Sequence, residues 1–150
     1  LIVLTAEGMI GCRDPLGIRP LVIGKLNEAF ILASETVALD VVGAEFVRSV
    51  EPGELVIIRD GELTSHHPFA ERPARPCIFE YVYFSRPDSI VDGTSVYSVR
   101  KAIGAELARE NAGEADLVIP VPDSGTPAAI GYAQESGIPF ELGTDVHSAR

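Results

Sequence analysis

Residues 116–133 read DLVIPVPDSGTPAAIGYA, and this stretch predicts a strand, a turn and a helix in that order. Residues 116–121 are almost all apolar, which is typical of a short strand buried in a parallel sheet. The turn residues Asp123–Thr126 follow, and Gly137 predicts the end of the helix. Because residues 138–142 form a second strand-like segment, the stretch predicts a β-α-β unit with a right-handed crossover, and therefore an α/β sheet.

A longer helix is expected before this unit. The apolar residues that recur at helical spacing are Val96, Val99, Ile103 and Leu107. These residues predict the buried face of the helix. Thr94 or Ser95 is the predicted N-cap, and Gly113 lies beyond the expected end.

The first 67 residues predict antiparallel β structure with one short helix. The predicted strands are residues 1–5, 9–13, 21–26, 29–33, 55–59 and 62–65. Asp60-Gly61 gives the clearest hairpin signal, because this pair suits the positive φ angles of a tight turn. Ser34 is the predicted cap of the short helix, and Gly43 is its predicted end.

Residues 68–76 read PFAERPARP and differ in character from both flanking regions. Their prolines disfavour a helix and a central strand alike. We interpret this segment as a connector between two domains, and a surface loop within one domain is the alternative.

The composition limits the possible partners. Twelve basic and 22 acidic side chains give a net charge of −10, which argues against nucleic acid or an anionic membrane as a partner. A small anionic substrate is still compatible, because helix N-termini bind phosphate without net positive charge. Cys12 and Cys77 are far apart, which favours a reduced cytoplasm over a disulfide framework. Because Leu1 begins inside an apolar run, we expect the start of the protein to lie upstream.

Residues 13–21 read RDPLGIRPL, and residues 33–35 read ASE. These residues alone predict a tightly turned β segment, in which Arg13 and Asp14 pair with each other or with neighbouring strands and Gly17 takes an unusual backbone angle. The pattern resembles the class II glutamine amidotransferases, which have an N-terminal-nucleophile fold. In that class an N-terminal Cys attacks the glutamine amide and its α-amino group serves as base. The resemblance implies that the nucleophile lies upstream, so that no catalytic residue is expected within residues 1–150.

Residues 77–89 read CIFEYVYFSRPDS, an aromatic, β-prone run that ends in a polar turn. These residues alone predict a strand followed by a local pair between Arg86 and Asp88. The order of residues resembles a signature of the amidophosphoribosyltransferase family that other class II amidotransferases lack. In the iron–sulfur members of that family the signature Cys ligates a [4Fe–4S] cluster, which implies this role for Cys77 in the full protein. A cluster needs four thiolates, so we expect the others downstream.

The turn Asp123–Thr126 has two alternative interpretations. Asp123 or Ser124 caps the helix, or the turn binds phosphate at the helix N-terminus. The turn has neither the Lys of a P-loop nor the glycines of a dinucleotide fingerprint, so ATP and NAD are not indicated.

The same turn, VPDSG, resembles the pyrophosphate-binding loop of amidophosphoribosyltransferase. The resemblance implies that Asp123, Ser124, Gly125 and Thr126 bind the substrate in a type I phosphoribosyltransferase fold. It also implies that Ser124 is associated with the Mg²⁺ of the magnesium–phosphoribosyl pyrophosphate complex. The family's paired acidic residues are expected beyond residue 150, and residues 144–150 depart from the family pattern.

Two isolated features are interpreted as structural. Cys12 is expected to be a buried packing residue, because free Cys behaves as a small hydrophobe. His66 and His67 have no Cys or carboxylate at ligand spacing, so we interpret them as surface histidines of a strand.

The resemblance implies a division of the chain into three regions. Residues 1–67 are expected to be the end of an α+β glutaminase domain, residues 68–91 a connector, and residues 92–150 the start of an α/β phosphoribosyltransferase domain. The full enzyme is expected to transfer glutamine-derived ammonia to phosphoribosyl pyrophosphate, giving 5-phosphoribosylamine in the first step of de novo purine (IMP) biosynthesis.

The fragment itself is expected to be inactive, and the full protein to be a cytoplasmic homo-oligomer without nucleic acid or membrane partners. Another class II amidotransferase and a non-catalytic scaffold are the alternatives.

Overall fold

A computed structural model describes residues 1–111 and 113–143 of the chain. Residues 144–150, where the sequence departs from the family pattern, lie outside the described residues. None of the described helices is long and apolar enough to cross a membrane.

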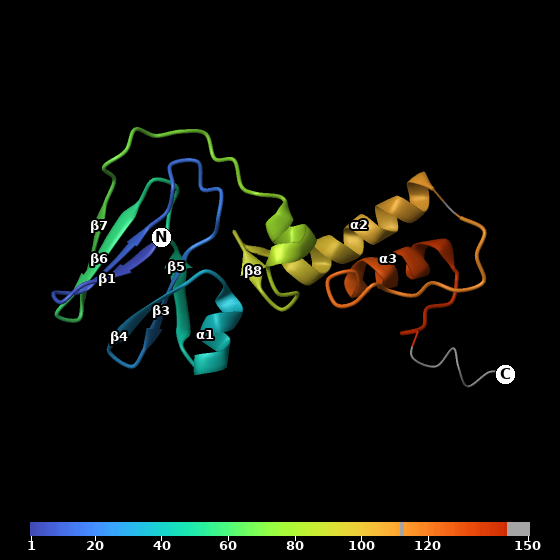
Figure 1. Ribbon diagram of the computed structural model, residues 1–150, viewed down its shortest axis with the longest axis horizontal. Helices are drawn as coiled ribbons and strands as arrows, with labels where there is room; N and C mark the ends of the chain where they lie inside the picture. The colour runs from blue at the N-terminus through green and yellow to red at the C-terminus, as the bar shows by residue number, and fades with distance from the viewer. Residues whose placement is uncertain (112, 144–150) are drawn as a thin grey trace. The chain divides into compact units, whose positions relative to one another are not determined.

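The chain divides into two compact units, which are described separately below (Figure 1). The first unit consists of Leu1–Glu80 and Ile90–Gly93, and the second consists of Tyr81–Ser89 and the chain from Thr94 onward. The predicted connector, residues 68–91, is therefore shared between the units. The assignment of residues 1–67 and 92–150 to two different domains of an enzyme stays a prediction.

The first unit contains two antiparallel sheets and one helix. Its elements are β1 (Ile2–Leu4), β2 (Met9–Cys12), β3 (Val22–Leu26), β4 (Ala29–Ala33), α1 (Thr36–Val42), β5 (Glu45–Ser49), β6 (Leu55–Arg59), β7 (Glu62–His66) and β8 (Ile90–Val91). One sheet has the order β1-β2-β6-β7, and the other has the order β4-β3-β5. The six strands predicted in this region are confirmed, and β5 is an additional strand that pairs with β3.

Two hairpins of the first unit form through their turn residues, and the sequence predicts the turn of one of them, Asp60-Gly61. In the β6–β7 hairpin Asp60 and Gly61 have φ angles of 51° and 78°, as a two-residue turn with positive φ at both positions requires. In the β3–β4 hairpin Asn27 has a φ angle of 52°. Both turns therefore follow from local residue chemistry.

Strand β3 carries the core of the first unit on both of its faces. One buried cluster consists of Leu21, Ile23, Val50 and Val56. The other cluster consists of Val22, Leu39 and Ala44, with Leu39 contributed by α1. Successive residues of a strand point to opposite faces, so Val22 and Ile23 stabilise different layers. Complete burial of each large aliphatic side chain stabilises the fold by about 1.5–3 kcal/mol.

Helix α1 ends as predicted but does not begin as predicted. Gly43 closes it in the left-handed region, with a φ angle of 72°. The predicted cap at Ser34 is wrong: Glu35 is the N-cap, and no side chain caps the helix. Burial of Val37 and Leu39 stabilises α1 instead, which is how most short helices in proteins are held.

The signature segment forms a helical turn, so the predicted strand is wrong. Residues Glu80–Phe84 form one turn of π-helix, labelled η1. The buried side chain of Arg100 donates hydrogen bonds to the carbonyl oxygens of Tyr81 (2.5 Å) and Ser85 (2.7 Å). This tertiary contact explains why a β-prone sequence is helical here, because β propensity depends strongly on context.

The second unit is built on β9 (Thr94–Ser95), α2 (Val96–Glu110) and α3 (Thr126–Ser136). Ser95 is the N-cap of α2, and its hydroxyl oxygen accepts a hydrogen bond from the backbone N–H of Ser98 at 3.3 Å. This cap confirms one of the two predicted positions.

The predicted buried face of α2 is confirmed at Val96, and the rest of the face is shifted by one residue. The buried residues are Val96, Arg100, Gly104 and Ala108. Ile103 and Leu107 are exposed. A Cβ atom on Gly104 would lie 1.8 Å from the carbonyl oxygen of Ala128, so α2 and α3 meet backbone to backbone. The buried face of α2 is therefore set by the close approach of the two helices at small residues. The largest apolar side chains of α2 do not determine it.

The predicted β-α-β unit is present only as one parallel bridge. Val118, which precedes α3 in the chain, forms a parallel bridge with Phe140, which follows α3. The N–H of Val118 donates to Pro139 O at 2.8 Å, and the N–H of Glu141 donates to Val118 O at 3.0 Å. The parallel direction is as predicted, but the strands expected at 116–121 and 138–142 are not formed. Among the described residues no further strand extends this bridge into a sheet.

Candidate functional site

The loop before α3 is shaped by its backbone. Gly125 is the N-cap of the helix, and Pro127 occupies the first turn. The N–H of Gly125 donates to Val121 O at 3.2 Å, and the N–H of Thr126 donates to Asp123 O at 3.2 Å. A Cβ atom at position 125 would lie 2.6 Å from Val121 O, so only glycine fits this turn without rearrangement.

The loop side chains have no capping role. Asp123 is exposed and Ser124 is half-buried, and no side-chain hydrogen bond caps α3. The capping interpretation of Asp123 and Ser124 is therefore wrong. A helix N-terminus has a positive dipole end and favours anions. The interpretation that Asp123, Ser124, Gly125 and Thr126 bind phosphate stays a prediction.

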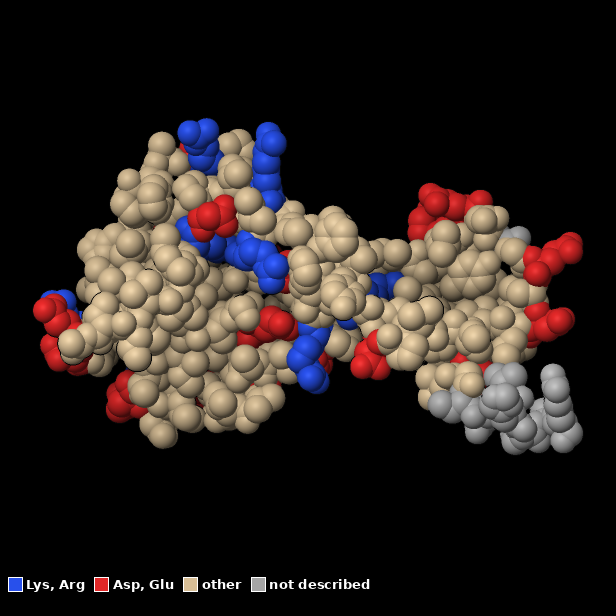
Figure 2. All heavy atoms as spheres, in the orientation of Figure 1, with Lys and Arg blue, Asp and Glu red and all other residues tan. Residues whose placement is uncertain are grey.

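A cavity of about 610 Å³ adjoins this loop within the second unit. Two chain segments line it, Pro122–Ser124 and Tyr83–Pro87, together with Arg100. Its charged lining residues are Arg86, Arg100 and Asp123. Acidic side chains predominate in the chain, and Figure 2 shows them on the drawn face of both units. The cavity departs from this balance, because two arginines and one carboxylate line it.

Arg86 and Asp88 form the local pair that the sequence predicts. Nε of Arg86 donates to Oδ1 of Asp88 and Nη2 donates to Oδ2, both at 3.1 Å. These hydrogen bonds lower the pKa of Asp88, so the carboxylate stays ionised beside the arginine. The pair fixes the plane of the guanidinium at the cavity wall.

The donor set at the loop suits a hydrated Mg²⁺ ion. Ser124 offers a hydroxyl oxygen and Asp123 a carboxylate, and Mg²⁺ is usually held by few protein oxygens together with water and substrate phosphates. No group of three or more metal-ligating side chains occurs at this loop among the described residues. Magnesium at Ser124 would therefore depend on phosphate oxygens of a ligand, and its presence stays a prediction.

Cys77 is half-buried, and its backbone N–H donates to Ile18 O at 3.0 Å. The sequence contains two cysteines, whereas a [4Fe–4S] cluster takes four thiolates. In the part of the chain that the structure describes, Cys77 belongs to no cluster of metal-ligating side chains. The residues present cannot complete such a cluster, and Cys77 as one of its ligands stays a prediction.

Cys12 is half-buried at the end of β2, whereas the sequence predicts a buried packing residue. Its thiol lies 3.8 Å from the carbonyl oxygen of Arg13. This contact is with the neighbouring residue in the chain.

Arg13 organises the RDPLGIRPL loop from a buried position. Its guanidinium donates hydrogen bonds to the carbonyl oxygens of Gly17, Arg19 and Val50. It also forms an ion pair with Asp92 at 3.2 Å. The carboxylate of Asp14 instead accepts hydrogen bonds from the backbone N–H groups of Leu16 and Ile18. Mutual pairing of Arg13 and Asp14 is therefore wrong, and both residues hold the loop that Gly17 turns with a φ angle of 61°.

A salt bridge links the first two sequence motifs. Arg19 of RDPLGIRPL pairs with Glu80 of the Cys77–Ser89 signature at 2.5 Å. Glu80 is buried, whereas Arg19 is largely exposed. Sequence analysis missed this pair because nothing local connects the two residues.

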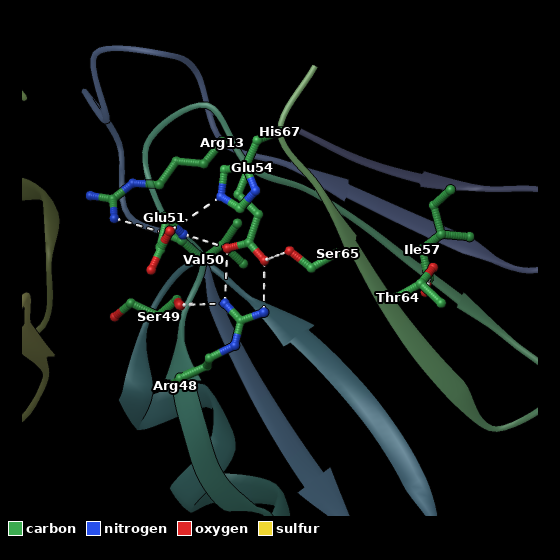
Figure 3. Close-up of polar contacts among 10 residues, drawn as sticks. All are labelled: Arg13, Arg48, Ser49, Val50, Glu51, Glu54, Ile57, Thr64, Ser65 and His67. Carbon is green, nitrogen blue, oxygen red and sulfur yellow. Dashed lines mark hydrogen bonds and ion pairs between the residues drawn. The ribbon is translucent and has the colours of Figure 1, made fainter. Parts of the chain in front are cut away.

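Glu54 is a second buried ionised group that sequence analysis missed (Figure 3). Its carboxylate accepts two hydrogen bonds from Arg48, at 2.7 and 2.8 Å, and one from the Ser65 hydroxyl at 2.6 Å. The N–H of Glu51 is a further donor at 2.7 Å. Burial raises the pKa of Glu54, but the hydrogen bonds from Arg48 and Ser65 outweigh this effect and lower it to about 2.

His67 lies closer to carboxylates than the sequence predicts. Its Nε2 is 3.2 Å from a carboxylate oxygen of Glu51, and Glu51, Glu54 and His67 offer ligand atoms within 4.8 Å of one another. Both histidines are exposed and His66 ends β7, which confirms the prediction of surface histidines, although the fold brings two carboxylates near His67. A cation here would compete with Arg48, which already occupies both oxygens of Glu54. The group is best described as an ion-pair network.

Comparison with known proteins gives consistent matches. The curated amidophosphoribosyltransferase of Rhizobium etli is 53% identical over 148 residues, which are 95% of this chain and 30% of that protein. That of Mycobacterium tuberculosis H37Rv is 56% identical over 135 residues, 90% of this chain and 25% of that protein. The solved glutamine phosphoribosylpyrophosphate amidotransferase from Bacillus subtilis, complexed with ADP and GMP, matches with a TM-score of 0.90 at 51% identity, covering 95% of this chain and 31% of that chain. No protein-family model matches. The chain thus spans 25–30% of the length of these curated relatives.

Proposed function

Because the chain belongs to the amidophosphoribosyltransferase family, we propose that it is part of an enzyme that transfers glutamine-derived ammonia to phosphoribosyl pyrophosphate. The product is 5-phosphoribosylamine, formed in the first step of de novo purine (IMP) biosynthesis. The C–O bond to pyrophosphate breaks at the anomeric carbon, and a C–N bond to ammonia forms. Pyrophosphate leaves with the electron pair of the broken bond.

The second unit binds the diphosphate in this proposal. The observation that carries it is the position of Ser124, which lines a cavity and directly precedes Gly125, the N-cap of α3. The N–H groups of the first helical turn and the Ser124 hydroxyl hold the anionic group. Magnesium, when bound with the substrate, neutralises charge on the leaving pyrophosphate. Asp123 and Ser124 are the residues that would hold it.

The first unit supports the glutaminase half of the enzyme. Its buried Arg13 and the loop that this residue organises support the sheet more than they perform the chemistry of glutamine hydrolysis. The nucleophilic thiol of the class is not supplied by Leu1. We therefore expect the 150-residue chain alone to show neither glutaminase nor transferase activity.

Further properties belong to the same proposal. Cys77 supplies one thiolate of a [4Fe–4S] cluster in the full-length enzyme, and the enzyme is a cytoplasmic homo-oligomer. Iron content and absorbance of full-length wild-type protein, compared with a Cys77→Ser variant, test the cluster. Equal iron content in both would contradict this role of Cys77.

Titration of the isotopically labelled chain with magnesium–phosphoribosyl pyrophosphate tests the diphosphate site. The amide signals of Ser124, Gly125 and Thr126 are expected to shift, and Ser124→Ala is expected to weaken binding. Ser98→Ala is the matched control, because Ser98 is exposed on α2 of the same unit. A wild-type chain whose signals at these three residues do not move would contradict the proposal, and would favour a non-catalytic scaffold.

A further inference from the structure

A second segment that lines the cavity beside Ser124 carries a positive charge on an exposed arginine. Arg86 lines the same cavity as Asp123 and Ser124, although it comes from the segment that follows η1. Its side chain is 67% exposed, so a ligand in the cavity can reach it. Asp123 is the one carboxylate among the described lining residues. The cavity therefore combines the loop that leads into α3 with a guanidinium, and a single acidic group lines it.

This segment is held in place from inside the second unit. Arg100 of α2 is buried and donates to the carbonyl oxygens of Tyr81 and Ser85, which precede Arg86 in the chain. The same helix lies against α3, because a Cβ on Gly131 would be 1.9 Å from Lys101 O. Helix α2 thus connects the segment that carries Arg86 with the helix that carries the diphosphate loop.

The side chain of Arg86 is also oriented. Asp88 accepts hydrogen bonds from Nε and Nη2, which fixes one edge of the guanidinium. A planar guanidinium matches the oxygens of a phosphate group and can donate two parallel hydrogen bonds to it. A lysine ammonium at the same position would supply charge without this geometry.

We infer that Arg86 contacts the diphosphate group of a ligand bound at Ser124, and that Asp88 orients it for this contact. The inference rests on the proposed function, since it assigns a further residue to the same site. Arg86 is a binding residue on the segment Tyr83–Pro87 of the cavity lining, and Arg100 is a positioning residue that holds this segment.

Binding of magnesium pyrophosphate to the 150-residue chain tests the inference. Affinity is measured by calorimetry at low ionic strength, and the amide signals of residues 124–126 are followed in parallel. Arg86→Gln is expected to weaken binding by about three- to tenfold, because a charge-assisted hydrogen bond is lost at a partly solvated site. Arg86→Lys is expected to recover part of this loss.

Arg59→Gln is the matched control. Arg59 is similarly exposed, at 57%, and pairs with the carboxylate of Glu7, but it lies in the first unit outside the cavity. Its substitution is expected to leave pyrophosphate affinity unchanged. Circular dichroism of each variant confirms that the fold is retained.

The possible outcomes distinguish the role of Arg86 from the diphosphate site itself. If pyrophosphate shifts residues 124–126 and Arg86→Gln binds as tightly as the wild-type chain, the role of Arg86 is overturned while the diphosphate site stands. If pyrophosphate shifts no amide signal of residues 124–126 in the wild-type chain, both the diphosphate site and the role of Arg86 are contradicted. An equal loss of affinity in Arg59→Gln and Arg86→Gln also overturns the inference, because it would reflect only total charge.

Discussion

Gly104 of α2 lies so close to Ala128 of α3 that a Cβ on the glycine would stand 1.8 Å from the Ala128 carbonyl oxygen. Gly131 of α3 approaches Lys101 of α2 in the same way, at 1.9 Å. Because neither glycine has a side chain, the backbones of α2 and α3 can pack in direct contact. This contact decides which face of α2 is buried, and it holds α3, which follows the loop Asp123–Thr126, against the helix that binds the segment carrying Arg86.

Substitution of Gly104 is expected to destabilise the second unit. In Gly104→Ala the added methyl group meets backbone atoms that cannot move without separating the helices, so we expect a loss of about 1–3 kcal/mol in unfolding free energy. Urea unfolding, followed by the amide signals of α2 and α3, measures this loss. Gly113→Ala is the control, since its Cβ would meet only the Tyr132 hydroxyl at an ordinary 3.6 Å. Equal stability of both variants would contradict the close helix contact.

Loss of the Glu54 carboxylate is expected to destabilise the first unit. Glu54→Gln removes the charge that pairs with Arg48 and leaves the arginine head group poorly matched, at a cost of about 2–3 kcal/mol. Chemical unfolding of the variant measures the effect. Glu7→Gln breaks an exposed ion pair with Arg59 and is expected to cost less than about 1 kcal/mol. A Glu54→Gln variant as stable as Glu7→Gln would show that the buried pair contributes nothing.

Glu54 also predicts an acid dependence of stability. Its pKa is about 2 in the folded chain, below the ordinary value of 4.5. A carboxyl group with a lowered folded pKa stabilises the fold above its unfolded pKa and loses this contribution as the pH falls through the folded value. The stability difference between wild type and Glu54→Gln should therefore be constant above about pH 5 and shrink between pH 4.5 and pH 2. A difference that does not change over this range would contradict the assignment.

Replacement of Arg13 by lysine is expected to loosen the RDPLGIRPL loop. An ammonium cannot reproduce the hydrogen bonds that the guanidinium donates to Gly17, Arg19 and Val50, so we expect a loss of about 2–3 kcal/mol. Hydrogen exchange at the amide groups of Gly17 and Ile18 should become faster. Arg59→Lys, at an exposed ion pair, is the control and should leave both quantities nearly unchanged. Unchanged exchange in Arg13→Lys would show that the loop does not depend on the guanidinium.

The elements that the sequence predicts best depend on neighbouring residues. Asp60-Gly61 forms its hairpin because the pair tolerates positive φ at two successive positions. Ser95 caps α2 because its hydroxyl lies within reach of the next turn. Gly43 and Gly137 end their helices in the left-handed region, with φ angles of 72° and 76°.

The predictions that are wrong concern residues whose partners lie far away in the sequence. The aromatic run 80–84 is β-prone by itself, but Arg100 binds its carbonyl groups and a helical turn results. The sequence does not predict the carboxylate beside His67. The β6–β7 hairpin places His67 near Glu51, which is 16 residues earlier in the chain. The candidate site at Asp123–Thr126 stays a prediction, and the cavity that brings Asp123 and Ser124 together with Arg86 is a product of folding.

The hairpins, the C-terminal ends of α1 and α3, the family resemblance and the turn at Asp123–Thr126 can be read from the sequence, since turn chemistry and motif order depend on adjacent residues. The buried side of α2, the ionised state of Glu54 in the core, and the cavity that Arg86 and Ser124 both line follow from the fold. Close packing and electrostatic pairing depend on distances in space, and folding brings together residues that are far apart in the chain.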